Sequence, residues 1–111
     1  MKKLLTTVML PVFVCSLAPD ASAQDAKAGE KKVAMCIGCH GIPGYQASFP
    51  EVYKVPMIAG QGAKYIATAL GEYKRGERKH PTMRSIAAGL SDKDITELAA
   101  YYGNAENGRT K

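Results

Sequence analysis

Five consecutive residues, Cys36-Ile37-Gly38-Cys39-His40, constrain this chain more than any other feature. Two thiols three positions apart lie about one helical turn apart and so face the same side of a short helix. At that spacing each thiol can form a thioether with one of the two vinyl groups of a haem, and the histidine is carried beneath the iron. The motif predicts one covalent haem c, anchored by Cys36 and Cys39, with His40 as the proximal ligand.

Two other uses of paired cysteines compete with haem attachment. A thiol–disulfide site shares the Cys-x-x-Cys spacing, but it occurs in a strand–helix–strand context and does not need the histidine. A structural zinc ion needs four ligands, so a second pair would have to close the site. The other cysteine and histidine of the chain are Cys15 and His80, and we expect the segment that holds Cys15 to be removed.

The first 23 residues have the pattern of a secretory signal peptide. Residues 1–3 form a basic start, residues 4–18 are almost all apolar or small, and residues 21–23 (Ala-Ser-Ala) supply a small-residue cleavage site. A membrane-spanning helix needs about 20 apolar residues, so this 15-residue run is too short to be one. We therefore expect export, cleavage after Ala23, and no stable membrane span.

Cleavage would leave one small basic domain, residues 24–104, followed by a polar tail, residues 105–111. Removing 23 of 111 residues leaves 88, and the net charge falls from +5 to +4 with the loss of two lysines and one aspartate. A chain of this size buries only about 60–65% of its unfolded surface, and it has no Trp and two Phe. A flat apolar macrocycle would fill so thin a core, and we expect the haem-free chain to be largely unstructured.

Two stretches in the first three quarters of the chain have helical patterns. Residues 25–34 contain helix-favouring Lys and Glu, and Gly29 among them indicates either close approach of another helix or a frayed end. Residues 62–74 place five apolar side chains on one face, and Gly76 follows as a stop. We assign these five to core packing: Tyr65, Ile66, Ala69, Leu70 and Tyr73.

Residues 91–103 form the clearest helical pattern. Ser91 is a good N-cap, and the aspartates of the first turn suit the positive end of the helix dipole. Leu90 before the cap can pack against Ile95, and Gly103 is a natural stop. One face then carries Ile95, Leu98, Ala99 and Tyr102. The predicted fold class is all-α.

Residues 41–61 show no helical period and contain three prolines. A structureless segment of this length is unusual in a compact domain unless it has a function. We expect it to wrap one edge of the haem, with Tyr45, Phe49 and Tyr53 packed on the macrocycle or on one another.

Residues 74–84 form a basic segment that contains one acidic residue, Glu77. It is either a solvated loop or a positive collar that steers docking to acidic surfaces of redox partner proteins. A nucleic-acid role is disfavoured because the charge is modest and no binding motif is present. Its basic members are Lys74, Arg75, Arg78, Lys79 and Arg84.

Four residues after the signal segment are candidates for the sixth iron ligand: Met35, Met57, Met83 and His80. Met35 adjoins Cys36, so it cannot reach the opposite face of the haem. Met57 follows Pro56, in the loop expected on the proximal side. Met83 and His80 share a loop between two predicted helices that can present a side chain inward. A thioether raises the reduction potential, whereas a second imidazole lowers it.

The chain resembles class I c-type cytochromes, most closely the small bacterial single-haem proteins of the c-553 and c4 kind. Besides the haem motif, the resemblance is carried by residues 56–61 (Pro-Met-Ile-Ala-Gly-Gln), Met83 and residues 90–102. It implies a cytochrome c fold of three to four short helices wrapped around one haem. It also implies that Met83 is the distal ligand and that the carbonyl of Pro56 accepts a hydrogen bond from His40.

The same resemblance implies how the helices pack and what the protein does. In such proteins the first and last helices cross closely, which suits Gly29 or Val33 against Leu98 or Tyr101. An iron with both axial positions filled transfers single electrons and transforms no substrate, so the implied role is a periplasmic electron carrier and not an enzyme. The alternatives are an electron-transfer subunit of a dehydrogenase that oxidises sulfide or an alcohol, and a haem peroxidase, which needs a vacant distal position.

Overall fold

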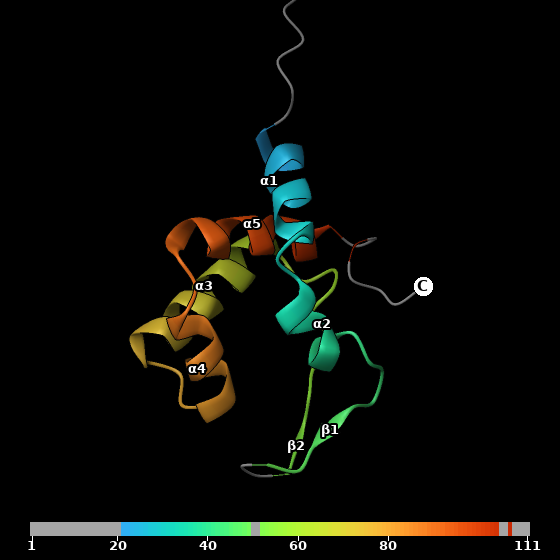
Figure 1. Cartoon of the computed structure of the whole chain (residues 1–111), viewed down its shortest axis with the longest axis vertical. Helices are drawn as coiled ribbons and strands as arrows, with labels where there is room; N and C mark the ends of the chain where they lie inside the picture. Colours follow the sequence, from blue (N-terminus) through green and yellow to red (C-terminus); the bar gives the residue numbers. More distant parts are fainter. Residues whose placement is uncertain (1–20, 50–51, 105–106, 108–111) are drawn as a thin grey trace, which may run out of the picture.

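The structure is a computed structural model that describes residues 21–49, 52–104 and 107, with side chains from residue 25 onward. Within this part the all-α fold class is confirmed, with five helices instead of the expected three or four, and one two-stranded hairpin (Figure 1). The elements are α1 (Ala21–Glu30), α2 (Ala34–His40), β1 (Gln46–Ala47), β2 (Tyr53–Lys54), α3 (Ala63–Arg75), α4 (Pro81–Ala88) and α5 (Asp92–Gly103).

Two ends of the chain lie mostly outside the described residues. Of the expected signal peptide, only residues 21–23 are described, as the start of α1. Of the expected tail, only Asn107 is described. None of the helices in the described ranges combines the length and the apolar character that crossing a membrane requires.

Helix α1 crosses α5 at Gly29. A Cβ atom added there would lie 2.9 Å from the Cβ of Tyr101 and far inside contact distance of the Glu97 carbonyl oxygen. Of the two interpretations of Gly29, close approach of a second helix is therefore the correct one. The crossing also agrees with the implied pairing of Gly29 with Tyr101.

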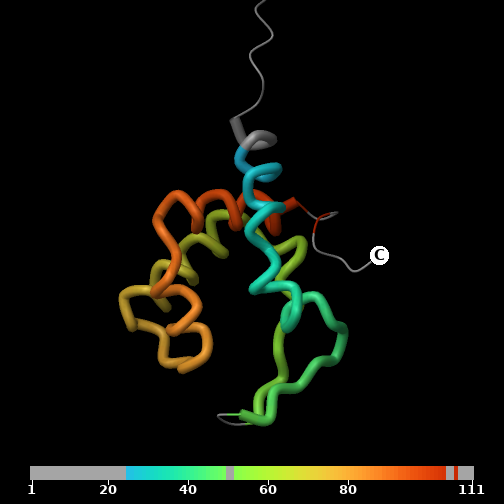
Figure 2. The backbone as a smooth tube through the Cα atoms, in the orientation of Figure 1, coloured from blue at the N-terminus to red at the C-terminus, as the bar shows by residue number. Residues whose placement is uncertain are grey.

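The first helix begins and ends four residues earlier than predicted. The expected helix over residues 25–34 ends at Glu30, and a turn precedes α2, which begins at Ala34. The backbone N–H groups of Lys31 and Lys32 donate to the carbonyls of Ala28 and Gly29, three residues back, which tightens the chain into the turn. The turn redirects the chain so that α2 runs along one side of the molecule while α1 stays on α5 (Figure 2).

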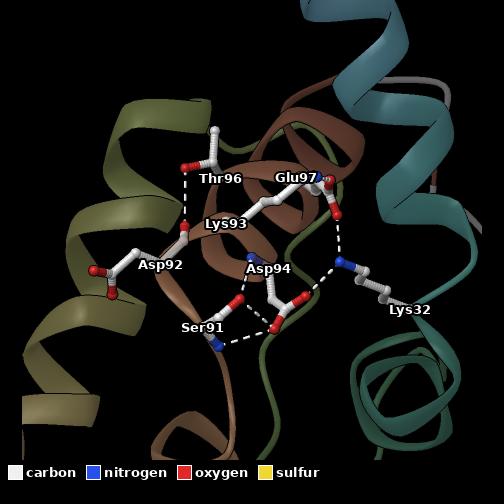
Figure 3. Close-up of polar contacts among 7 residues, drawn as sticks. All are labelled: Lys32, Ser91, Asp92, Lys93, Asp94, Thr96 and Glu97. Carbon is white, nitrogen blue, oxygen red and sulfur yellow. Dashed lines mark hydrogen bonds and ion pairs between the residues drawn. The ribbon is translucent and has the colours of Figure 1, made fainter.

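The turn after α1 is tied to α5 by charge. The ammonium group of Lys32 donates to the carboxylates of Asp94 and Glu97 (Figure 3). Glu97 is 5% exposed, and Lys93 lies 3.8 Å from its other carboxylate oxygen. We call Lys32, Asp94 and Glu97 the charge cluster. It holds the segment that leads directly into the haem motif.

Helix α5 is confirmed and forms the centre of the core. Its capping box is complete: Asp94 N–H donates to the Ser91 hydroxyl at 3.1 Å, and Ser91 N–H donates to the Asp94 carboxylate at 2.8 Å. Leu90 and Ile95 are both buried, as the predicted contact requires. The core cluster joins α5 to α3 and comprises Ile66, Leu90, Ile95, Leu98, Ala99 and Tyr102.

Helix α3 begins and ends within one residue of the prediction. Gly76 caps it in the left-handed conformation at φ 80°, as expected of a glycine stop. The assignment of its whole apolar face to the core is wrong for Tyr65, which is 53% exposed, and for Tyr73, which is half-buried outside the core cluster. Both side chains instead line the cavity described below.

Two segments expected to be irregular are ordered elements. In residues 41–61 the chain forms a hairpin with Gln46 opposite Lys54 and Ala47 opposite Tyr53. The expected loop around Met83 is helix α4, because Pro81 occupies the first helical position, where a missing N–H costs nothing. Met83 is the third residue of this helix.

Candidate haem-binding site

A cavity of about 360 Å³ lies between α2, the hairpin, α3, α4 and α5. Its volume is in the range of small-molecule and cofactor sites, about 300–1,000 Å³. Its walls bring together every residue that the sequence assigned to the haem: Cys36, Cys39, His40, Pro56 and Met83. The three alternative axial candidates, Met35, Met57 and His80, also line it.

Helix α2 supplies the two thiols. Cys36 and Cys39 are free and partly buried, and both line the cavity. Burial raises the pKa of the Cys36 thiol, and the nearby Cys39 adds to the rise. Cys36 packs against the core cluster. The anchoring helix is thus fixed at one end to the core and presents its thiols to the cavity.

The ring of His40 is oriented by a single hydrogen bond. Its Nδ1 lies 2.6 Å from the carbonyl oxygen of Pro56. A carbonyl oxygen only accepts, so Nδ1 carries the hydrogen and donates. In the neutral ring Nε2 then keeps its lone pair, which is the form a metal ligand requires. This is the contact that the family resemblance implied for Pro56.

His80 makes the opposite kind of contact. The backbone N–H of Met83 donates to His80 Nδ1 at 3.5 Å, so this ring nitrogen accepts. The ring also meets that of Tyr53 edge-on, with centroids 4.8 Å apart and planes 64° apart. His80 therefore caps helix α4 and contacts the hairpin across the edge of the cavity.

The three methionines at the cavity differ in position. Met35 belongs to α2 itself and is 56% exposed, while Met57 directly follows Pro56 and is 41% exposed. Met83 is partly buried and comes from α4. Helices α4 and α2 stand on opposite sides of the molecule (Figure 1), and Met83 is the cavity-lining methionine that belongs to α4.

Most of the basic segment is paired within the chain. Lys74 binds Asp92 at 2.8 Å and Arg75 binds Glu77 at 2.8 Å. In the described part of the chain no ion pair is found for Lys79 or Arg84. The positive collar stays a prediction, and its unpaired members would be Lys79 and Arg84.

Arg78 is the exception within that segment, because it lines the cavity. Its guanidinium lies 3.4 Å from the Glu72 carboxylate and 5.0 Å from the centroid of the Tyr73 ring. The pKa of Arg78 is raised, and a hydrogen bond to Tyr65 is the main cause. Among the described cavity-lining residues it is the one lysine or arginine. The sequence showed only its charge, not its inward position.

Tyr102 was expected to be a core residue, and the structure adds a polar role. The side chain is 2% exposed and lines the cavity, and no hydrogen-bond partner for its hydroxyl is found among the described residues. Burial raises its pKa, so the hydroxyl stays protonated. A buried unpaired hydroxyl is costly. One at the wall of an apolar cavity is consistent with a site built for a group that the protein binds.

These features together fit a haem. Two thiols one helical turn apart lie on one wall, an imidazole with a free Nε2 lies at the end of the same helix, and a thioether faces them. In the described ranges no group of three or more His, Cys, Asp or Glu could hold a metal ion, so no closing ligands for a zinc ion are found there. The zinc interpretation of the cysteines therefore has no support.

Comparison with known proteins places the chain in a family. The family model described as Cytochrome c matches residues 26–105. The chain therefore belongs to the cytochrome c family and is a class I c-type cytochrome, a haem-binding protein of electron transport.

Three relatives illustrate the kinds of protein that this chain is similar to. Cytochrome c-554(548) of Halomonas halodenitrificans is 42% identical over 87 residues, covering 76% of this chain and 100% of the relative. Cytochrome c4 of Pseudomonas aeruginosa is 36% identical over 104 residues, covering 94% of this chain and 49% of the relative. The cytochrome subunit of sulfide dehydrogenase from Chlorobaculum tepidum is 37% identical over 76 residues, covering 68% of this chain and 64% of the relative. The chain thus spans about half the length of the cytochrome c4 relatives.

Proposed function

We propose that the protein is a periplasmic one-electron carrier with a single haem c, bound through Cys36 and Cys39 and ligated by His40 and Met83. The observation that carries the ligand set is geometric. His40 presents an unprotonated Nε2 because Pro56 engages its Nδ1, and Met83 faces the motif from α4. The chain has one Cys-x-x-Cys-His motif, which supports one haem.

Each residue of the proposed site has a separate role in electron transfer. A bound haem supplies the one-electron couple between ferrous and ferric iron. The thioether anchors prevent loss of the cofactor, and the Pro56 carbonyl fixes the His40 ring and raises its basicity. The sulfur of Met83 would favour ferrous iron. If His40 and Met83 both held the iron, no position would remain for a substrate, so we propose that the protein itself is not an enzyme.

Partner docking is proposed to use the basic residues that remain free. Lys79 directly precedes His80, the cap of α4, and Arg84 lies in the first turn of α4, so both are next in sequence to residues that line the cavity. Unpaired surface charge steers association with acidic partner proteins and loses its effect as salt is added. The rate of electron transfer should then fall as ionic strength rises.

A second role is supported by one of the relatives. The match to a cytochrome subunit of sulfide dehydrogenase favours an electron-transfer subunit of a periplasmic dehydrogenase as the alternative. Size-exclusion chromatography of protein purified from its native periplasm separates the two roles. A carrier elutes alone, whereas a subunit elutes with its dehydrogenase.

The ligand set is tested by spectra and potentials of the exported protein. Met83→Ala should open the sixth position, so that ferric protein becomes high-spin, binds cyanide at once, and has a lower potential. Met57→Ala is the matched control and should leave all three unchanged. If Met83→Ala keeps the low-spin spectrum and the potential, Met83 is not the ligand. Immediate tight cyanide binding by the wild-type protein would favour a peroxidase.

A further inference from the structure

The two histidines of the chain make opposite use of the same ring atom. Nδ1 of His40 donates to the Pro56 carbonyl, whereas Nδ1 of His80 accepts from the Met83 backbone N–H. A neutral imidazole carries one hydrogen, so the free nitrogen of His40 has a lone pair and the Nε2 of His80 bears the hydrogen. The two rings line one cavity, but only His40 is in the form that binds iron.

His80 sits where helix α4 begins. It is the N-cap residue, with an extended backbone at φ −81° and ψ 114°, and Pro81 follows at the first helical position. Its side chain accepts from the N–H of the third helical residue, which is the usual geometry of an N-cap. That third residue is Met83, so the cap acts directly on the backbone that carries the proposed distal ligand.

The hairpin fixes the His80 ring from the other side. Tyr53 on β2 meets the ring edge-on at 4.8 Å between centroids. Such aromatic pairs are favourable beyond the area they bury. The ring is therefore held between the hairpin and the first turn of α4.

We propose that His80 is a positioning residue for Met83, not an iron ligand: by capping α4 while packed on Tyr53, it holds the methionine toward the iron. The inference rests on the proposed His40 and Met83 ligand set. For Nε2 of His80 to bind iron instead, Nδ1 would have to carry the hydrogen. Two donors, Nδ1–H and the Met83 N–H, would then face each other and the cap would be lost.

Loss of the cap should show as easier detachment of Met83. Cyanide binds ferric iron only when the methionine is off, so its binding rate reports the detached fraction. We expect His80→Ala to raise this rate about fivefold, which corresponds to ~1 kcal/mol, the usual contribution of an N-cap. The far-red absorption band of methionine bound to ferric iron should weaken in the same variant.

His80→Asn separates the two roles of the side chain. Asparagine is a good N-cap but does not replace imidazole as an axial ligand. We expect His80→Asn to restore the cyanide rate and the far-red band to near wild-type values. Ser91→Ala, which removes the cap of α5, is the matched control, because Ser91 itself does not line the cavity. It should lower the melting temperature without raising the cyanide rate.

The cyanide-binding rates of the two His80 variants test the inference directly. If His80→Asn behaves like His80→Ala, or if neither variant changes the cyanide rate, His80 does not act through the cap and the inference is wrong. The wild-type spectrum tests the proposed function separately. Absence of the far-red band from the wild-type ferric protein would refute methionine ligation before any variant is compared.

Discussion

The α1–α5 crossing and the walls of the cavity are stabilised in different ways. At the crossing the contacts are made within the chain: Gly29 lets the helices touch, and Lys32 pairs with Asp94 and the buried Glu97. At the cavity large apolar side chains remain open, with Phe49 86% exposed and Tyr65 53% exposed.

This difference shows what the chain can do without its cofactor. Exposed aromatic rings and the unpaired Tyr102 hydroxyl line a space that the described residues do not fill. Burial of apolar surface is the main favourable term in folding. The cavity side should therefore depend on the haem for its stability, and the crossing should depend on contacts within the chain.

The largest effect is expected from removal of the anchors. Cys36→Ala/Cys39→Ala cannot form thioethers, so the exported chain should lack haem and lose cooperative thermal unfolding, followed by circular dichroism. A haem-free double variant that is compact and melts cooperatively would show that the cavity walls stand without the cofactor.

The next effect is expected at the crossing. Gly29→Ala puts a methyl group against the Glu97 carbonyl, and overpacking of this kind costs about 1–3 kcal/mol. Denaturant unfolding of the holoprotein would measure the loss. The control is Gly71→Ala in α3, where the nearest neighbour is the flexible end of Arg75. That change should stabilise by about 0.5–1 kcal/mol through helix propensity. Equal effects of the two substitutions would contradict a tight crossing.

The charge cluster should give a smaller, pH-dependent effect. The Lys32 ammonium, aided by Ser91, holds the pKa of Asp94 well below its ordinary value. A carboxylate with a depressed pKa stabilises the fold above its unfolded pKa, about 3.9, and this contribution is lost as pH falls below that value. Wild-type melting temperature should therefore decline in acid.

Lys32→Met tests the same cluster. It should lower the melting temperature at neutral pH, because Glu97 keeps only Lys93, at 3.8 Å. It should also make the acid decline shallower, since the main cause of the Asp94 pKa shift is gone. Melting curves from neutral to acidic pH measure both effects. An unchanged acid slope would mean that the cluster does not control acid stability.

The smallest stability effect is expected at the cap of α5. Ser91→Ala removes the hydroxyl that accepts from Asp94 N–H, and such losses cost about 1 kcal/mol. Chemical denaturation gives the magnitude, and the visible spectrum should stay that of the wild type. A change in the spectrum would show that the two regions are coupled more closely than their contacts indicate.

The sequence predicted the features that depend on local patterns. The haem motif, the α5 cap and the glycine stop after α3 each need only a few neighbouring residues, and the structure has them where expected. Gly29 could be flagged as unusual, and the family resemblance implied its contact with Leu98 or Tyr101, but the close approach to the Glu97 carbonyl, 68 positions away, is seen only in the structure.

Other features depend on distant or ambiguous information. Pro81 can end a helix or begin one, and the pattern alone did not tell that it starts α4. An apolar face suits a core and a cofactor cavity equally, which is why Tyr65 and Tyr73 were assigned to the core. Lys32 pairs with residues that lie 62 and 65 positions further along the chain, and no local sequence pattern predicts such distant ion pairs.

The most direct test of the central claim is the intact mass of the exported, purified protein under denaturing conditions. We predict the mass of the chain lacking its first 23 residues plus one haem, with no thiol at Cys36 or Cys39 open to alkylation. A chain mass without haem, with both thiols alkylated, would contradict covalent attachment and with it the electron-carrier role.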